Sequence, residues 1–180
     1  MDVSNLAYEI AREMGVSEED CHELARAGMI HDIGKVTLMG EPELEGNPLV
    51  VEEMHYVRLH PHKGYLVALE NGYSDTVCES ILYHHENYDG SGYPYRLEGR
   101  NIPMGARILR VSDVFCALTS DRPYRKAFDE ETAVRLMIDE IKNYDMKVFL
   151  AFQRVIHRGA HKKVRMPDIS LDVRGELKES

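Results

Sequence analysis

The sequence has no tryptophan, only three cysteines among its 180 residues, and no apolar run near the ~18 to 20 residues that a membrane-spanning helix needs. Cys21, Cys78 and Cys116 are odd in number and widely spaced. That spacing argues against a disulfide framework or a Cys-x-x-Cys metal site, and it fits a reducing, cytoplasmic compartment. The first residues are amphipathic and acidic, unlike a secretory signal. The sequence therefore excludes the disulfide-rich, secreted and membrane-spanning classes.

Positively charged residues are also few: the sequence has 22 lysines and arginines against 31 acidic residues, which gives a net charge of −9. A surface of this sign disfavours nucleic acid polymers and anionic membranes as partners. A small phosphorylated ligand stays compatible if the binding site supplies its own positive charge. Nine histidines in an acidic chain are the first indication of such a site.

Alternating β patterns and internal repeats are missing, and the apolar residues follow helical spacing nearly throughout. We expect one all-α domain over residues 1–158, a helical bundle with a metal site in its core, and a polar tail over residues 159–180. Ser17 is a predicted N-cap, Pro61 a predicted helix start, and Gly15 and Asn71-Gly72 are predicted helix ends. The predicted helices cover about residues 6–14, 17–31, 51–59, 61–70, 74–84, 104–119, 129–142 and 145–158, with loops over 37–48 and 87–103.

Histidines and aspartates recur at the predicted helix ends and inside one helix. A single histidine at a helix end is more often a cap or a core residue than a ligand, but Asp113 lies among apolar residues, where an unpaired carboxylate is costly. Donors distributed over four helices are what a metal site in a bundle core requires. The six candidate ligands are His31, Asp32, His60, His84, His85 and Asp113.

These donors are nitrogen and oxygen atoms without a thiolate, which favours iron or manganese, with zinc or nickel as alternatives. Six ligands exceed what one ion takes when positions are left open for water. We therefore expect two divalent ions, with Asp32 as the bridging carboxylate.

Four segments, running from about Leu24 to Phe128, carry a family resemblance. The segments are residues 31–35 (HDIGK), 60–64 (HPHKG), 84–94 (HHENYDGSGYP) and 112–125 (SDVFCALTSDRPYR). Together they closely resemble the HD-GYP subgroup of the HD-domain phosphohydrolases. The resemblance implies an all-α bundle with a bi- or trinuclear metal centre that hydrolyses cyclic di-GMP to the linear dinucleotide or GMP through a metal-activated hydroxide.

The resemblance also implies roles for individual residues. The six candidate ligands match the family's metal ligands, with Asp32 catalytic as well, and Lys35 matches a lysine beside the reaction centre. Arg122 and Arg125 match contacts to substrate phosphate. Tyr93 matches the named loop, where it either lies near a guanine base or packs the loop. Glu86 is expected to orient an imidazole ligand without binding the metal itself.

The sequence departs from the family pattern at two places. Relatives carry a further histidine in the first helix, but residues 1–21 contain none, so we expect the chain to begin just past that turn, with Asp2 as a candidate substitute. Residues 36–41 also differ from the usual loop. Both departures bear on metal occupancy near His31.

Two alternatives to an active cyclic di-GMP phosphodiesterase stay open. One is a weakened binding module that contacts a GGDEF-type partner through the loop ending at Pro94. The other is an HD phosphohydrolase for another nucleotide, such as a hybrid cyclic dinucleotide. A homodimer is compatible with either alternative.

Overall fold

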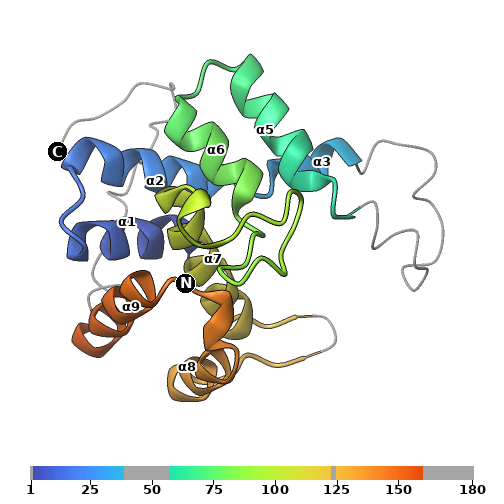
Figure 1. Cartoon of the computed structure of the whole chain (residues 1–180). Helices are drawn as coiled ribbons and strands as arrows, with labels where there is room; N and C mark the ends of the chain where they lie inside the picture. The colour runs from blue at the N-terminus through green and yellow to red at the C-terminus, as the bar shows by residue number, and fades with distance from the viewer. Residues whose placement is uncertain (1, 39–56, 123–124, 160–180) are drawn as a thin grey trace, which may run out of the picture.

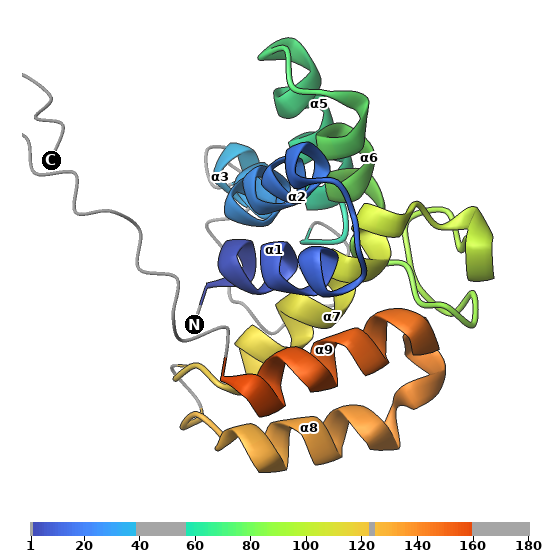
Figure 2. The same cartoon turned by 90° about the vertical axis from the view of Figure 1, so that its left-hand side faces the viewer.

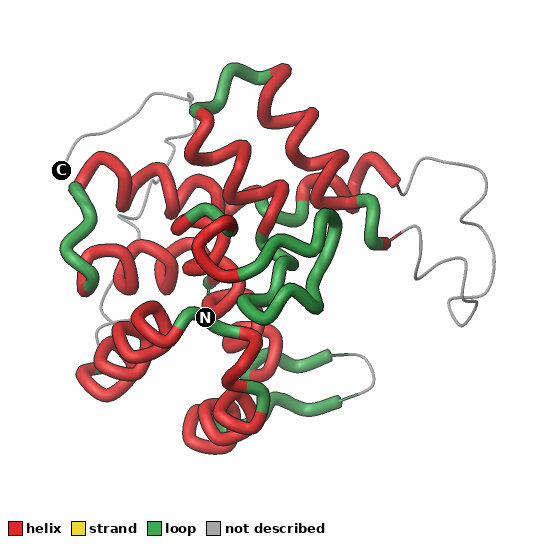
Figure 3. The backbone as a smooth tube through the Cα atoms, in the orientation of Figure 1, coloured by secondary structure: helices red, strands yellow, loops and turns green. Residues whose placement is uncertain are grey.

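The computed structural model describes residues 2–38, 57–122 and 125–159, and these residues form a bundle of helices without a β-strand (Figures 1 and 3). The all-α prediction is confirmed. The predicted helix over 51–59 and the predicted tail lie almost entirely outside the described residues. The helices are α1 (Val3–Glu13), α2 (Glu18–Ile30), α3 (Ile33–Leu38), α5 (His60–Glu70), α6 (Asp75–Tyr83), α7 (Met104–Leu118), α8 (Glu130–Asp139) and α9 (Met146–Arg158), with 3-10 turns η2 (Gly99–Asn101) and η3 (Ile141–Asn143).

The helix boundaries follow the capping residues in the sequence. The hydroxyl of Ser17 accepts a hydrogen bond from the backbone N–H of Asp20 and begins α2, and Ser74 caps α6 in the same way. Two boundaries differ from prediction. The short helix α3 lies where the sequence pattern stops, and α8 ends at Asp139, after which the chain tightens into η3.

The hydrophobic core lies between α1, α2, α6, α7 and α9, with α7 packing against helices on several sides (Figure 2). Phe115 of α7 and Phe152 of α9 pack edge to face with ring centres 4.9 Å apart. Leu6, Ile10 and Ile81 are fully buried beside them. Within the described ranges, no helix combines the length and the apolar character needed to cross a bilayer.

The glycine of the HDIGK segment sets the spacing of α3 and α5. A Cβ on Gly34 would collide with the carbonyl oxygen of His60 and would lie 2.6 Å from the backbone nitrogen of Gly64. The two helices therefore touch backbone to backbone. This contact brings Asp32, just before α3, next to His60, the first residue of α5.

Candidate metal centre

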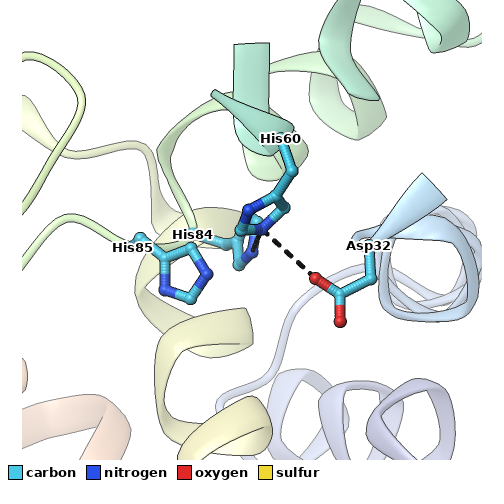
Figure 4. Close-up of side chains that lie close together, drawn as sticks. All are labelled: Asp32, His60, His84 and His85. Carbon is cyan, nitrogen blue, oxygen red and sulfur yellow. Dashed lines mark hydrogen bonds and ion pairs between the residues drawn. The ribbon is translucent and has the colours of Figure 1, made fainter. Parts of the chain in front are cut away.

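Six side chains predicted as ligands reach one region of the bundle from four separate parts of the chain. His31 ends α2, Asp32 follows it, and His60 begins α5. His84 ends α6 with His85 directly after it, and Asp113 lies on α7. Figure 4 shows Asp32, His60, His84 and His85 directed toward one another, and one ligand atom from each lies within 4.8 Å of the others.

Three of the histidines are held in the same tautomer by their own helices. In each of them Nδ1 lies close to the carbonyl oxygen three residues earlier: 2.7 Å from Gly28 for His31, 2.5 Å from Val57 for His60, and 2.6 Å from Ile81 for His84. A carbonyl oxygen only accepts, so Nδ1 carries the proton. In the neutral form of each ring, the Nε2 atom therefore carries no proton and can donate to a metal.

These donors face one another without a proton between them. The Nε2 atoms of His60 and His84 lie 3.3 Å apart, and the Oδ1 atom of Asp32 lies 3.2 Å from Nε2 of His60. The Oδ1 atom is buried and has no hydrogen-bond partner among the described residues. Three electron-rich atoms at this separation repel unless a cation lies among them, so the donor set fits a divalent metal ion.

The other oxygen of Asp32 faces a second group. Its Oδ2 atom lies 3.6 Å from Nε2 of His31, and Oδ1 of Asp113 lies 3.5 Å from the same nitrogen. That nitrogen is also buried without a hydrogen-bond partner in the described part of the chain. Asp32 thus spans two donor groups, one with His31 and Asp113 and the other with His60, His84 and His85.

Electrostatics keeps most of these groups in the protonation state that a metal requires. Burial and the neighbouring charge of His31 lower the pKa of His84 to about 3, and burial and His84 lower the pKa of His85 to about 2. Burial opposes ionisation of Asp113, but its contact with His31 outweighs this and lowers its pKa to about 2. His60, His31 and Lys35 together hold the pKa of Asp32 well below its usual range. At neutral pH both carboxylates are charged, and His84 and His85 are neutral.

The structure places the predicted cationic residues in different surroundings. The ammonium of Lys35 lies 2.6 Å from Oδ2 of Asp32, next to the donor groups. Arg122 is exposed on the turn after α7. The guanidinium of Arg125 donates to the carbonyl oxygens of Ala117, Leu118 and Lys126 at the end of α7, and no hydrogen bond or ion pair in the described ranges joins it to the six donors.

The loop after His85 folds back onto that histidine. The Tyr93 ring stacks on the His85 ring with centres 4.8 Å apart and planes 20° apart, and its N–H donates to the His85 carbonyl. A Cβ on Gly92 would collide with the backbone nitrogen of Asn87, so only glycine allows this close return. Burial raises the pKa of Tyr93 to about 12, which keeps the phenol neutral.

Two sequence expectations need correction. Glu86 does not orient an imidazole: its buried carboxylate accepts hydrogen bonds from the backbone N–H groups of Tyr95 and Leu97, at 2.7 and 3.1 Å, and so holds the loop. Asp2 is the N-cap of α1, where its carboxylate accepts from the N–H of Ser4. It is not among the clustered donors that the described residues form.

The family model for the HD domain matches residues 1–148. The chain belongs to the HD-domain family. Its motifs and its relatives place it in the HD-GYP subgroup. It is 39% identical over 134 residues to the cyclic di-GMP phosphodiesterase response regulator RpfG of Xanthomonas campestris, over 73% of this chain and 35% of that protein.

Other relatives differ in the substrate that their names give. The chain is 35% identical over 155 residues to a cyclic di-GMP phosphodiesterase of Pseudomonas aeruginosa, over 86% of this chain and 37% of that protein. It is 36% identical over 152 residues to the 3'3'-cGAMP-specific phosphodiesterase 1 of Vibrio cholerae, over 82% of this chain and 35% of that protein. This HD-GYP chain thus spans little more than a third of the length of these relatives.

Solved structures confirm the fold. A cyclic GMP-AMP-specific phosphodiesterase of V. cholerae superposes with a TM-score of 0.70 at 15% identity, over 89% of this chain and 44% of that one. An HDG"Y"P protein of Bdellovibrio bacteriovorus gives a TM-score of 0.67 at 20% identity, over 87% of this chain and 50% of that one. The HD-GYP chain therefore has the HD-domain helical bundle.

Proposed function

We propose that this chain is a metal-dependent phosphodiesterase that hydrolyses cyclic di-GMP to the linear dinucleotide, GMP or both. The observation that carries the proposal is the facing pair of Nε2 nitrogens on His60 and His84, 3.3 Å apart, with an unpartnered oxygen of Asp32 beside them. The names of the relatives supply the reaction class. The proposed ligands are His31, Asp32, His60, His84, His85 and Asp113.

The proposed centre holds two divalent ions, iron or manganese, with zinc or nickel as alternatives. All six ligands are imidazoles or carboxylates, and these ions accept such mixed nitrogen and oxygen sets. The support for two ions is Asp32, whose two oxygens face different histidines. When bound, a pair of divalent ions lowers the pKa of a water molecule to near neutrality and offsets the charge of a phosphodiester.

The side chains of the protein then have separate tasks. Asp32, charged at neutral pH, supplies negative charge to both donor groups. Lys35 lies against Asp32, where its ammonium reaches the reaction region and can donate a proton to the leaving oxygen. Arg122 and Arg125 are proposed to bind substrate phosphate. Arg125 has to release its carbonyl partners on α7 to do so.

The test is hydrolysis of cyclic di-GMP by the purified chain after anaerobic loading with Mn(II) or Fe(II). The loaded chain should release linear dinucleotide or GMP, and His84→Ala should abolish release. His62→Ala is the matched control, because His62 is exposed on α5 and should leave the rate unchanged. A fully loaded chain without turnover would overturn the proposal.

A second candidate substrate is 3'3'-cGAMP. The similarity to the cGAMP-specific enzyme of V. cholerae is as high as that to the cyclic di-GMP phosphodiesterase of P. aeruginosa, which favours including it. Both substrates carry two phosphodiesters and differ in one base. Comparing kcat/KM for the two on the same preparation decides which one the chain prefers.

Three sequence predictions remain proposals beside this one. They are a domain limit at residue 158, a GGDEF-type partner that contacts the loop ending at Pro94, and a homodimer. A cytoplasmic location is likewise proposed from the three free cysteines.

A further inference from the structure

Two arginines outside the matched segments lie near Tyr93, Arg58 at its ring and Arg110 at the loop that contains it. The guanidinium carbon of Arg58 lies over this ring, 5.2 Å from its centre. Tyr93 itself stacks on His85, with ring centres 4.8 Å apart. The distance from the guanidinium carbon of Arg58 to the centre of the His85 ring therefore cannot exceed the sum of these two distances.

The second arginine reaches the same loop from α7. Arg110 lies one turn before Asp113, and its Nε donates to the side-chain oxygen of Asn87 at 3.0 Å. Asn87 lies against Gly92, where the loop returns next to Tyr93. Positive charge from two different segments thus lies at the loop whose Tyr93 stacks on His85.

Neither guanidinium is neutralised by a carboxylate in the part of the chain that the structure describes. Arg107 pairs with buried Asp145, Arg154 with Glu13, and Arg135 with Glu131, but no such ion pair involves Arg58 or Arg110. Arg58 is exposed, and Arg110 is half-buried. Two cations without counter-ions beside an interior donor cluster are unusual in a chain with a net charge of −9.

We infer that Arg58 and Arg110 form an anion subsite that binds the second phosphate of a cyclic dinucleotide while the first lies at the six donors. This inference rests on the proposed function. A cyclic dinucleotide carries two phosphates, and only one can occupy the metal ligands at a time. A guanidinium presents a planar fork that matches phosphate oxygens, and Arg110 keeps both terminal nitrogens without a hydrogen-bond partner among the described residues. The terminal nitrogens of Arg125, in contrast, donate hydrogen bonds to backbone carbonyls.

The test is equilibrium binding by calorimetry to the Mn(II)-loaded chain with two probes. One is the hydrolysis-resistant bis-phosphorothioate analogue of cyclic di-GMP, and the other is inorganic phosphate. Arg58→Gln and Arg110→Gln should each raise the Kd for the analogue about tenfold, the amount expected from losing one charge-assisted hydrogen-bonded contact. The Kd for inorganic phosphate should stay within about twofold, because a single phosphate goes to the metal ligands.

Two further variants separate charge from geometry. Arg58→Lys keeps the charge without the planar fork and should give an intermediate loss. Arg135→Gln removes a positive charge from the exposed face of α8 and should bind both probes like the unmodified chain. Equal analogue affinity in Arg58→Gln, Arg110→Gln and Arg135→Gln would overturn the inference.

The remaining outcomes also decide the question. A chain that does not bind the analogue has no such subsite, and a variant that weakens both probes together acts on the metal centre, so either result counts against the inference. A chain that binds the analogue through the two arginines yet leaves cyclic di-GMP intact contradicts the proposed function alone.

Discussion

The carboxylate of Asp32 lies between His31 and His60, with Oδ2 3.6 Å from the first and Oδ1 3.2 Å from the second. The two histidines come from different helices, and Asp32 faces both. A carboxylate in this position would make the two halves of the proposed metal centre depend on each other.

This geometry predicts unequal effects of removing the two carboxylates. Asp32→Asn should reduce bound metal from about two ions per chain to nearly none, because both ions lose a ligand. Asp113→Asn should leave about one ion, since the contact of Asp113 is with His31, in one of the two donor groups. Elemental analysis of the three proteins measures this. Identical metal content in both variants would contradict a bridging role for Asp32.

The backbone contact between α3 and α5 predicts that one methyl group added at Gly34 strongly destabilises the folded chain. Gly34→Ala should lower the free energy of unfolding by about 3 kcal/mol, because the new Cβ collides with the His60 carbonyl, and it should also weaken metal binding. Urea denaturation gives the stability change.

Gly15→Ala is the control for this substitution. Gly15 has a φ of 77° with no atom near the position of a Cβ, so the cost there should be about 1 kcal/mol, with metal content unchanged. If the two variants are equally stable, the backbone contact does not set the helix spacing.

The motifs made most of the site predictable, because short segments fixed both the ligand types and their positions at helix ends. His31, His60 and His84 each lie at the end or the start of a helix that capping signals or a proline had already located. The all-α class followed from helical spacing in the same way.

The parts that the sequence did not predict depend on contacts between distant segments. Glu86 follows two histidines, yet the loop that returns at Tyr95 decides where its carboxylate points. Arg58 and Arg110 lie outside the matched segments, and the contacts of Arg58 with Tyr93 and of Arg110 with Asn87 form only in the folded chain. The helix α3 was missed because it is only six residues long.

The N-cap of α8 predicts a defined dependence of stability on pH. Hydrogen bonds from the backbone N–H and the hydroxyl of Thr132 lower the pKa of Asp129 below its ordinary value of 3.8. A lowered carboxyl pKa stabilises the folded state above the ordinary value, and this stabilisation is lost as pH falls through the folded-state value. Asp129→Ala should therefore lower Tm more at pH near 7 than at pH near 2.

Asp129→Asn serves as the comparison, because it keeps the hydrogen-bond acceptor without the charge. Its difference in Tm from the unmodified chain should shrink as the pH falls. A Tm difference for Asp129→Ala that does not change with pH would contradict the assignment of the shift to this cap.

The three cysteines should be inert in the folded chain. Cys21, Cys78 and Cys116 are all buried, and burial raises the pKa of each thiol, that of Cys116 to about 12. Because the thiolate is the reactive form, a disulfide reagent at about pH 8 should label none of them until urea unfolds the chain. Rapid labelling of one thiol in the native protein would show that its surroundings are more open than in this structure.

The most direct test of the metal centre is elemental analysis of the chain after anaerobic purification and loading with Mn(II) or Fe(II). The facing imidazole and carboxylate donors predict about two divalent ions per chain, lost in His84→Ala and retained in His62→Ala. A folded chain that takes up no divalent ion, or the same amount in both variants, would contradict the account.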